Sequence, residues 1–369
     1  MSAHMQCNKQ YNKVKALERK NTDRDEPPRA NDGREILHMQ VMKIGHSGIE
    51  VSRIALGTWA VGGGPWWGDG DDHESMEAIK AARSLGITLI DTAPVYGFGH
   101  SERVVGQAIK SFRDEVRIST KCGLVWDGRE GSFQFEQEGN RVVRNLTPES
   151  VRAELSQSLQ RLQTDFIHVY FTHWQSAPSF AVPIARTMDE LTNLKVKGKI
   201  KSIGASNVTT DHIQEYMKYG HLDIIQEKYS ILERRVEAEL VPACKQYGIS
   251  LQAYTPLEHG ALTGKFSKSY VPEKSSYRRK LWAFQPHAWP CVVEMVEKWA
   301  VLCQKYACSP SQLAVAWLLA QGDFINVLCG ARKRAHIEDA VGGKAVLLSA
   351  EDAALMRSWA DEAISRSNS

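Results

Sequence analysis

Hydrophobic and polar positions follow two patterns that alternate along most of the chain. Short runs rich in β-branched residues are typical of buried strands, and each is followed by a segment whose apolar positions recur with helical spacing. The runs predict eight strands, at 53–57, 88–92, 116–121, 166–172, 200–206, 224–230, 249–254 and 325–330. The helical spacing predicts helices at 73–85, 101–109, 147–162, 188–196, 236–247, 292–306 and 313–319, with weaker patterns at 185–195 and 337–341.

Local signals mark where some of these elements begin. Thr147 can cap the helix at 147–162 with Pro148 in its first turn. The sequence Ser-Pro-Ser-Gln at 309–312 is a capping-box pattern that opens the helix at 313–319. Before the first of the eight strands, segment 39–52 reads as a β-hairpin with a turn at His46-Ser47-Gly48.

The regular strand–helix order decides the fold class. Such alternation predicts a parallel sheet, and eight units over about 330 residues fit a closed (β/α)₈ TIM barrel. We therefore expect an α/β barrel with an N-terminal hairpin and extra C-terminal helices. The alternative is a doubly wound open sheet, which usually carries Gly-x-Gly-x-x-Gly after its first strand. The segment 57–64, Gly-Thr-Trp-Ala-Val-Gly-Gly-Gly, does not have that spacing.

The first 38 residues stand apart from this pattern. They are rich in charge, contain Pro27-Pro28 and have almost no periodic apolar positions. Acidic residues such as Glu18 and Asp23 argue against a transit peptide, and the lack of an apolar core argues against a secretory signal. We expect residues 1–38 to be a disordered extension of a barrel at 39–369. Limited proteolysis would then trim the chain to near Met39 without loss of function.

Composition narrows the possible classes of partner. Lys plus Arg number 46 and Asp plus Glu 43, a balance that predicts no nucleic-acid partner and no attraction to a membrane surface. No run of 18 apolar residues is present, so we expect no spanning helix. The seven cysteines are scattered and form no Cys-x-x-Cys pair, which predicts a cytoplasmic protein without a disulfide framework or a zinc ribbon.

Titratable residues gather where a barrel places its chemistry, at the carboxyl ends of the strands. Asp91 ends the second strand, Lys121 the third and His173 follows the fourth, and Tyr96 lies five residues beyond Asp91. Buried Asp and Lys side chains are costly unless they pair, so we expect an Asp91–Lys121 ion pair. An ammonium beside the Tyr96 phenol stabilises the phenolate, so we expect a lowered Tyr96 pKa and an effective proton donor and acceptor.

These residues and their surroundings resemble the aldo-keto reductase family. Asp-Thr-Ala-Pro-Val-Tyr-Gly at 91–97, with His-Ser-Glu at 100–102, is similar to the family's first signature, and the likeness extends from about Met42 to Ile364. The resemblance implies a catalytic tetrad of Asp91, Tyr96, Lys121 and His173. It also implies that a reduced nicotinamide gives hydride to a carbonyl carbon while Tyr96 protonates the oxygen and His173 orients it. No metal is expected.

The same resemblance implies the cofactor site. Gly-Ala-Ser-Asn at 204–207 corresponds to the segment that holds the nicotinamide carboxamide, and 253–265 to the stretch that stacks on the nicotinamide and covers the pyrophosphate. The expected cofactor residues are Gly57, Thr58, Trp59, Asp91, Ser206, Asn207, Gln226, Tyr254, Thr255, Pro256, Leu257, Gly260, Lys265, Arg279, Gly330, Arg332, His336 and Asp339.

The expected cofactor is NADPH. Gly-Ala-Arg-Lys-Arg-Ala-His at 330–336 lies where the family holds the adenosine 2′-phosphate, and guanidinium groups at a helix N-terminus suit a phosphate dianion. A run of cations is otherwise a solvated face. His336 stands where relatives often have Gln or Arg, and Ala340 where Asn is common, which weakens the likeness.

The substrate itself stays open. We expect a small carbonyl compound bound by Trp59, Tyr96, Trp126, His173 and Trp174, with Trp66 and Trp67 either lining an apolar cleft or covering a loop. The loops at 123–145, 175–183 and 266–290 would set specificity. Two alternatives remain, a sugar or polyol dehydrogenase running on NAD and a cofactor-binding regulatory subunit of the potassium-channel β type. The sequence does not indicate the oligomeric state.

Overall fold

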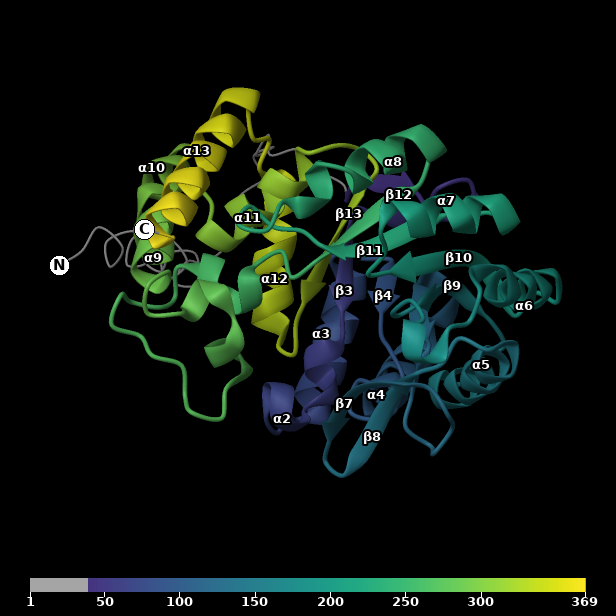
Figure 1. The fold of residues 1–369 in the computed structure, drawn as a ribbon. Coiled ribbons are helices and arrows are strands. Elements are labelled where there is room, and N and C mark those ends of the chain that lie inside the picture. Colours follow the sequence, from purple (N-terminus) through teal and green to yellow (C-terminus); the bar gives the residue numbers. More distant parts are fainter. Residues whose placement is uncertain (1–38, 369) are drawn as a thin grey trace, which may run out of the picture.

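Eight parallel strands close into a barrel, which confirms the predicted fold class. The computed structural model describes residues 39–368, and the predicted extension 1–38 lies outside them. Sequential strands are neighbours, and the last pairs with the first (Figure 1). The barrel strands are β3 (Ile54–Gly57), β4 (Leu89–Asp91), β5 (Arg117–Cys122), β9 (Ile167–Thr172), β10 (Ile200–Ser206), β11 (Ile224–Lys228), β12 (Ser250–Tyr254) and β13 (Ile325–Gly330).

A helix follows each strand and packs on the outside of the barrel. These helices are α3 (Asp72–Ser84), α4 (His100–Ile109), α5 (Pro148–Leu162), α6 (Ile184–Val196), α7 (Thr210–Tyr219), α8 (Leu240–Tyr247), α11 (Pro310–Leu319) and α12 (Arg334–Gly342). The predicted caps are present, because Thr147 accepts from the Ser150 amide and Ser309 and Gln312 form a reciprocal capping box.

Additional elements lie at both ends of the chain. The hairpin of β1 (Val41–Lys43) and β2 (Glu50–Ser52) precedes the barrel, as predicted. Outside the main helical layer lie α9 (Trp289–Lys298), α10 (Ala300–Lys305) and the C-terminal α13 (Ala350–Ser367), and α13 packs on α9 (Figure 1). Trp299 separates α9 from α10, so the single helix expected at 292–306 is two helices.

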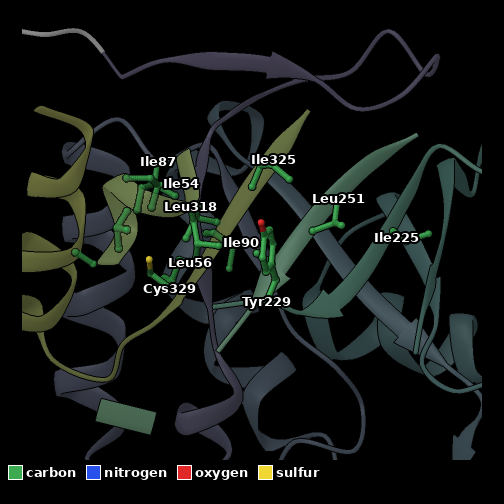
Figure 2. Packing of buried hydrophobic residues seen from close by; sticks show 14 of the residues in the cluster. Ile54, Leu56, Ile87, Ile90, Ile225, Tyr229, Leu251, Leu318, Ile325 and Cys329 are labelled. Carbon is green, nitrogen blue, oxygen red and sulfur yellow. The ribbon is translucent and has the colours of Figure 1, made fainter. Parts of the chain in front are cut away.

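Strand alternation divides the apolar residues between two layers. One side of each strand faces the helices and forms the main core, in which Ile54 and Leu56 of β3 and Ile325 of β13 lie; Figure 2 shows side chains of this layer on β3, β12, β13 and α11. The opposite side faces the barrel interior. There Ala55 and Leu89 join a smaller cluster whose hairpin members are Met42, Ile44 and Val51. The hairpin therefore seals the interior at one end.

The structure differs from the sequence predictions in two further elements, a small sheet and a helix. The segment expected as a loop at 123–145 folds into a three-stranded antiparallel sheet of β6 (Leu124–Val125), β7 (Ser132–Gln137) and β8 (Asn140–Arg144). Helix α7 was not expected, because its buried side is small, with only Ile213 and Tyr216 fully buried. Within residues 39–368, none of the helices has the length and apolar character that crossing a membrane requires.

Candidate active site

A fully buried ion pair lies at the carboxyl ends of β4 and β5. Lys121 Nζ donates to Asp91 Oδ2 at 2.7 Å and to the Thr92 carbonyl at 2.8 Å. Asp91 Oδ1 accepts from Ser119 Oγ at 2.8 Å and from Gln226 Nε2 at 3.0 Å. Both carboxylate oxygens are therefore satisfied, which is the condition under which a buried charge pair is stable. The predicted pairing of Asp91 with Lys121 is present.

Tyr96 is the third titratable residue of the group and contacts the Lys121 ammonium. Lys121 Nζ donates to Tyr96 Oη at 3.2 Å and lies 4.9 Å from the ring centroid. The chain around Tyr96 depends on Gly97, which has φ +62° and where a Cβ would overlap the Gly62 carbonyl oxygen. A Cβ on Gly62 would in turn lie 2.7 Å from the Tyr96 carbonyl carbon. These two glycines let the Tyr96 loop approach η1 (Trp59–Gly62) closely.

His173 follows β9 and faces Tyr96 from the neighbouring strand end. Its amide donates to the Cys122 carbonyl at 2.8 Å, its carbonyl accepts from Asn207 Nδ2 at 2.9 Å, and its ring centroid lies 5.9 Å from that of Tyr96. Burial, reinforced by the charge of Lys121, holds the pKa of His173 well below its usual value. The imidazole is therefore neutral at pH 7 and able to donate a hydrogen bond.

The direction of the Tyr96 pKa differs from the sequence expectation. Burial raises the pKa of the Tyr96 phenol more than the Lys121 charge lowers it, so the net shift is upward. Burial also lowers the pKa of Lys121, but Asp91 and Tyr96 outweigh that effect and keep its pKa raised. The pair at neutral pH is thus a neutral phenol beside an ammonium. The sequence argument considered the lysine and could not weigh the desolvation of the ring.

Four side chains expected to hold a nicotinamide lie next to this group, on β10, β11 and β12. Ser206 Oγ donates to the Gln226 carbonyl at 2.8 Å, and Asn207 Nδ2 donates to Ser206 Oγ at 3.1 Å. Tyr254 Oη donates to Asn207 Oδ1 at 3.1 Å. Asn207 has φ +57°, a left-handed conformation that Asn tolerates better than most residues. The hydrogen bonds therefore hold these four residues in one cluster beside Asp91.

The rim beyond Tyr254 has a polar atom suited to an additional ligand. Within residues 39–368, the Thr255 hydroxyl is buried and has no hydrogen-bond partner, and Thr255 has φ +56°. Buried hydroxyls are rarely left unpaired, so an unpaired one beside this cluster fits a bound polar group. Leu257 caps η5 (Glu258–Thr263), in which Gly260 has φ +98°. Thr58, which follows β3, donates from its amide and hydroxyl to the Asp91 carbonyl.

The residues expected around the adenosine phosphate are only partly together. Burial lowers the pKa of His336, the charges of Lys265, Lys333 and Arg332 lower it further, and the charge of Asp339 partly offsets them. Arg332 Nη1 donates to the Gly68 and Asp69 carbonyls at 3.4 and 3.3 Å.

Other expected residues are engaged elsewhere. Asp339 accepts from Ser309 Oγ at 2.8 Å, and Arg279 Nε donates to the Pro272 carbonyl at 3.1 Å. Lys333 pairs with Glu74 and Arg334 with Glu338.

Aromatic rings cover the mouth beside Tyr96. The Trp59 ring lies 6.3 Å from Tyr96, 5.3 Å from Trp67 and 6.2 Å from Tyr277 of η6 (Tyr277–Lys280), between ring centroids. Trp66, in α2 (Gly64–Trp67), contacts Tyr277 at 4.6 Å. This packing is compatible with both roles predicted for Trp66 and Trp67, lining a cleft or covering a loop.

The aromatic cover also contains His259, which sequence reasoning did not assign, and Phe135, which lies in the predicted specificity segment 123–145. His259 packs against Trp59, Trp67 and Tyr277, and Phe135 of β7 packs against Trp66. No motif marks them, because they come from separate loops that only the fold brings together.

Two expected substrate residues lie near other partners. Trp126 packs on Phe98 at 5.2 Å, and Arg144 lies 4.8 Å from the Trp174 ring. Among the described residues, no set of three His, Cys, Asp or Glu side chains is arranged to hold a metal ion.

A barrel with these groups at the carboxyl ends of its strands defines a class of protein. The chain belongs to the aldo-keto reductase family, since the family model described as "Aldo/keto reductase family" matches residues 53–361. It is an oxidoreductase that acts on carbonyl and alcohol groups with a nicotinamide cofactor, as members of this family do.

Individual relatives cover nearly the whole barrel. An Escherichia coli protein described as an NADH-specific methylglyoxal reductase is 49% identical over 88% of this chain and 99% of its own length. A Bacillus subtilis aldo-keto reductase is 38% identical over 81% of this chain and 87% of its own. The structure of a glycerol dehydrogenase from Gluconobacter oxydans has a TM-score of 0.78 and 32% identity, covering 88% of this chain and 95% of the other.

Proposed function

We propose that the protein reduces small aldehydes and ketones to alcohols with NADPH, and that Tyr96 is the proton donor. The observation that carries the proposal is the continuous contact from Asp91 through Lys121 to Tyr96, at 2.7 and 3.2 Å. The similarity to the Escherichia coli methylglyoxal reductase supports 2-oxoaldehydes as the substrate class. Tyr96 would act as catalytic acid, with Lys121, Asp91 and His173 completing the tetrad.

The bound nicotinamide would supply hydride to the carbonyl carbon. The neutral Tyr96 phenol would give its proton to the carbonyl oxygen as negative charge develops there. The Lys121 ammonium would stabilise the phenolate that remains, and Asp91 would hold the ammonium in place. The neutral imidazole of His173 would donate a hydrogen bond to the same oxygen. The phenolate would then recover a proton from water.

The raised pKa of Tyr96 favours reduction over alcohol oxidation. Reduction requires a protonated phenol, and a pKa raised above the ordinary value of about 10 keeps the phenol protonated throughout the neutral range. Alcohol oxidation requires the phenolate, which is scarce at those pH values. The complete set of four side chains likewise favours turnover over a purely regulatory subunit. We therefore rank the dehydrogenase and the regulatory subunit below the reductase.

The preference for NADPH is supported by the cations around His336. Lys265, Arg332 and Lys333 lower the pKa of that imidazole while Asp339 raises it, and a 2′-phosphate would meet the same mainly positive field. Lys333 and Arg334 also have acidic partners, and the Escherichia coli relative is described as NADH-specific. Arg332 donates to the Gly68 and Asp69 carbonyls rather than to a carboxylate, so we take it as the residue on which the preference depends.

The deciding experiment measures cofactor oxidation with methylglyoxal, an aromatic aldehyde, an aldose and a polyol, using NADPH and NADH. We expect Tyr96→Phe to lower kcat by about 100-fold or more while cofactor binding persists. Tyr229→Phe is the matched control, because its hydroxyl bonds to Glu237 away from the tetrad. Tight cofactor binding without turnover on any substrate would contradict the proposal in favour of a regulatory subunit.

The cofactor assignment has its own readout. Arg332→Gln should lower kcat/KM for NADPH by about 10-fold and leave that for NADH nearly unchanged, since a charge-assisted bond to phosphate would be lost. Equal or better kcat/KM with NADH in the wild type would overturn the NADPH assignment and leave carbonyl reduction standing.

A further inference from the structure

Three side-chain amides form a row across the barrel interior, directly behind the candidate active site. Gln226, Gln252 and Asn326 are in register on the adjacent strands β11, β12 and β13. Gln226 Nε2 donates to Gln252 Oε1 at 2.5 Å, and Gln252 Nε2 donates to Asn326 Oδ1 at 2.7 Å. All three side chains are buried, Gln252 and Asn326 completely. Buried amides of this kind are costly unless every member is paired.

Both ends of the row finish at a group that can only accept. Asn326 Nδ2 donates at 2.8 Å to the carbonyl of Ser52, the last residue of the hairpin that seals the barrel. At the other end, Gln226 Nε2 donates to Asp91 Oδ1 at 3.0 Å. Because the Ser52 carbonyl can only accept, the NH₂ group of Asn326 must face it, and the Asn326 oxygen then faces Gln252. The NH₂ group of Gln252 donates to that oxygen, which leaves the Gln252 oxygen facing Gln226. Each amide therefore has one satisfactory orientation.

The orientation of Gln226 has a consequence for the tetrad. The NH₂ group of its side chain donates two hydrogen bonds, one to Gln252 and one to Asp91. Reversing this amide would place its oxygen against the Asp91 carboxylate and against the Gln252 oxygen. The row therefore keeps a donor on Asp91 Oδ1, while Oδ2 remains with Lys121.

We propose that Gln252 and Asn326 are positioning residues for the reaction, which act through Gln226 to hold Asp91 and hence Lys121 beneath Tyr96. The inference rests on the proposed function. It assigns a role to two polar residues inside apolar strands that touch none of the four tetrad side chains. Their contribution is geometric, because a small displacement of a catalytic group costs rate even when binding is retained.

The test compares Gln252→Met, which keeps the length of the side chain and removes both hydrogen-bonding groups, with Ile325→Val as the matched control. Ile325 lies on β13 beside Asn326, but its side chain is part of the outer core. We expect Gln252→Met to lower kcat about 10-fold with less than twofold change in the KM of the carbonyl substrate. Asn326→Leu should act in the same direction with a smaller loss. Ile325→Val should lower Tm without changing kcat.

A second readout does not require turnover. Ultraviolet difference titration of each protein against the same protein carrying Tyr96→Phe gives the pKa of the Tyr96 phenol in the free protein. A less well-placed Lys121 stabilises the phenolate less, so Gln252→Met should raise this pKa by roughly half a unit or more. Gln252→Glu, while protonated, keeps one acceptor and one donor, so its kcat should approach that of the wild type at low pH and fall as pH rises.

The outcomes separate the two proposals. A wild-type kcat and an unchanged phenol titration in Gln252→Met would overturn the positioning role, as would a kcat loss that Ile325→Val reproduces. A wild type that reduces no carbonyl would refute the proposed function. An unmoved phenol titration in Gln252→Met would then refute the positioning role as well, whereas a moved titration would still support it.

Discussion

Each face of β5 contacts an ion pair, and the two pairs differ in burial and in what lies beside them. On the inner face, Lys121 pairs with Asp91 and its ammonium reaches Tyr96. On the outer face, Thr120 donates to Glu102 at 2.6 Å, and Glu102 pairs with Arg161 at 2.6 Å. Thr120 and Lys121 are consecutive residues of β5. Thr120 contacts the pair between the helices, whereas Lys121 belongs to the pair at the candidate active site.

The contrast shows that burial of a charge pair does not indicate catalysis by itself. Glu102 lies on α4 and Arg161 on α5, so their pair joins two helices to the barrel wall. Lys121 and Asp91 lie on two neighbouring strands at the open end, where a third titratable group meets them. Breaking the outer pair should therefore affect stability, and breaking the inner pair should affect the reaction most.

The largest effect is expected for Lys121→Met. Removing the ammonium leaves the Tyr96 phenolate without its positive neighbour, so kcat for carbonyl reduction should fall by roughly 100- to 10,000-fold. Asp91 keeps the hydrogen bonds from Ser119 and Gln226, so the variant should fold. Steady-state kinetics with circular dichroism as a control for folding would check this. A kcat within tenfold of the wild type would show that the contact is structural.

The next effect concerns the outer pair. Arg161→Met removes the counter-ion of the buried Glu102 carboxylate and leaves it the hydrogen bond from Thr120. The free energy of unfolding should fall by roughly 3 kcal/mol, because a buried charge loses its counter-ion. Denaturant unfolding measures this loss, and kcat at a temperature where the variant is folded should stay within about threefold. A large loss of kcat with unchanged stability would contradict the division between the two faces.

The smallest effect involves Glu154 of α5, whose carboxylate accepts from the Gly123 amide just beyond β5. Burial raises the pKa of Glu154 to about 8. The folded protein therefore binds this proton more tightly than the unfolded chain, and stability falls as pH rises. The contribution lost between pH 6 and pH 8 is about 2 kcal/mol.

Glu154→Gln isolates that contribution. The variant cannot ionise at this position, so its free energy of unfolding should fall less between pH 6 and pH 8 than that of the wild type. Burial holds the pKa of His168, on neighbouring β9, at about 3, so this imidazole stays neutral across the range and does not obscure the comparison. Identical pH slopes in the two proteins would refute the prediction.

The barrel was predictable because its signals are local and repeated. Every predicted strand overlaps an observed one, since β-branched runs mark strands buried on both faces. The sheet at 124–144 was missed because the apolar residues of its strands do not mark one buried face. Phe133 on β7, for example, is more than half exposed. Helix α7 was missed although its buried residues lie on one side, because its capping box uses His212 at the position where the usual sequence pattern has Glu or Gln.

The candidate site was predictable where a motif or a strand end marks it. Asp91, Lys121 and His173 end parallel strands, so topology alone brings them to one rim. Gln252 and Asn326 carry no motif and no charge, and their role depends on the register between strands. The signal available in the sequence was one amide in each of three consecutive apolar strands. The sign of the Tyr96 pKa shift required the degree of burial, which sequence does not provide.

The small sheet between β5 and α5 has a practical consequence for altering selectivity. Leu124 pairs with Arg144 and Val125 with Val143, so the chain leaves the barrel wall along β6 and returns to it along the antiparallel strand β8. Phe135 of its β7 strand packs against Trp66 above the mouth. A library that replaces residues between Val125 and Val143 would therefore exchange part of the aromatic cover beside Tyr96 while every barrel strand and Tyr96 itself stay as they are.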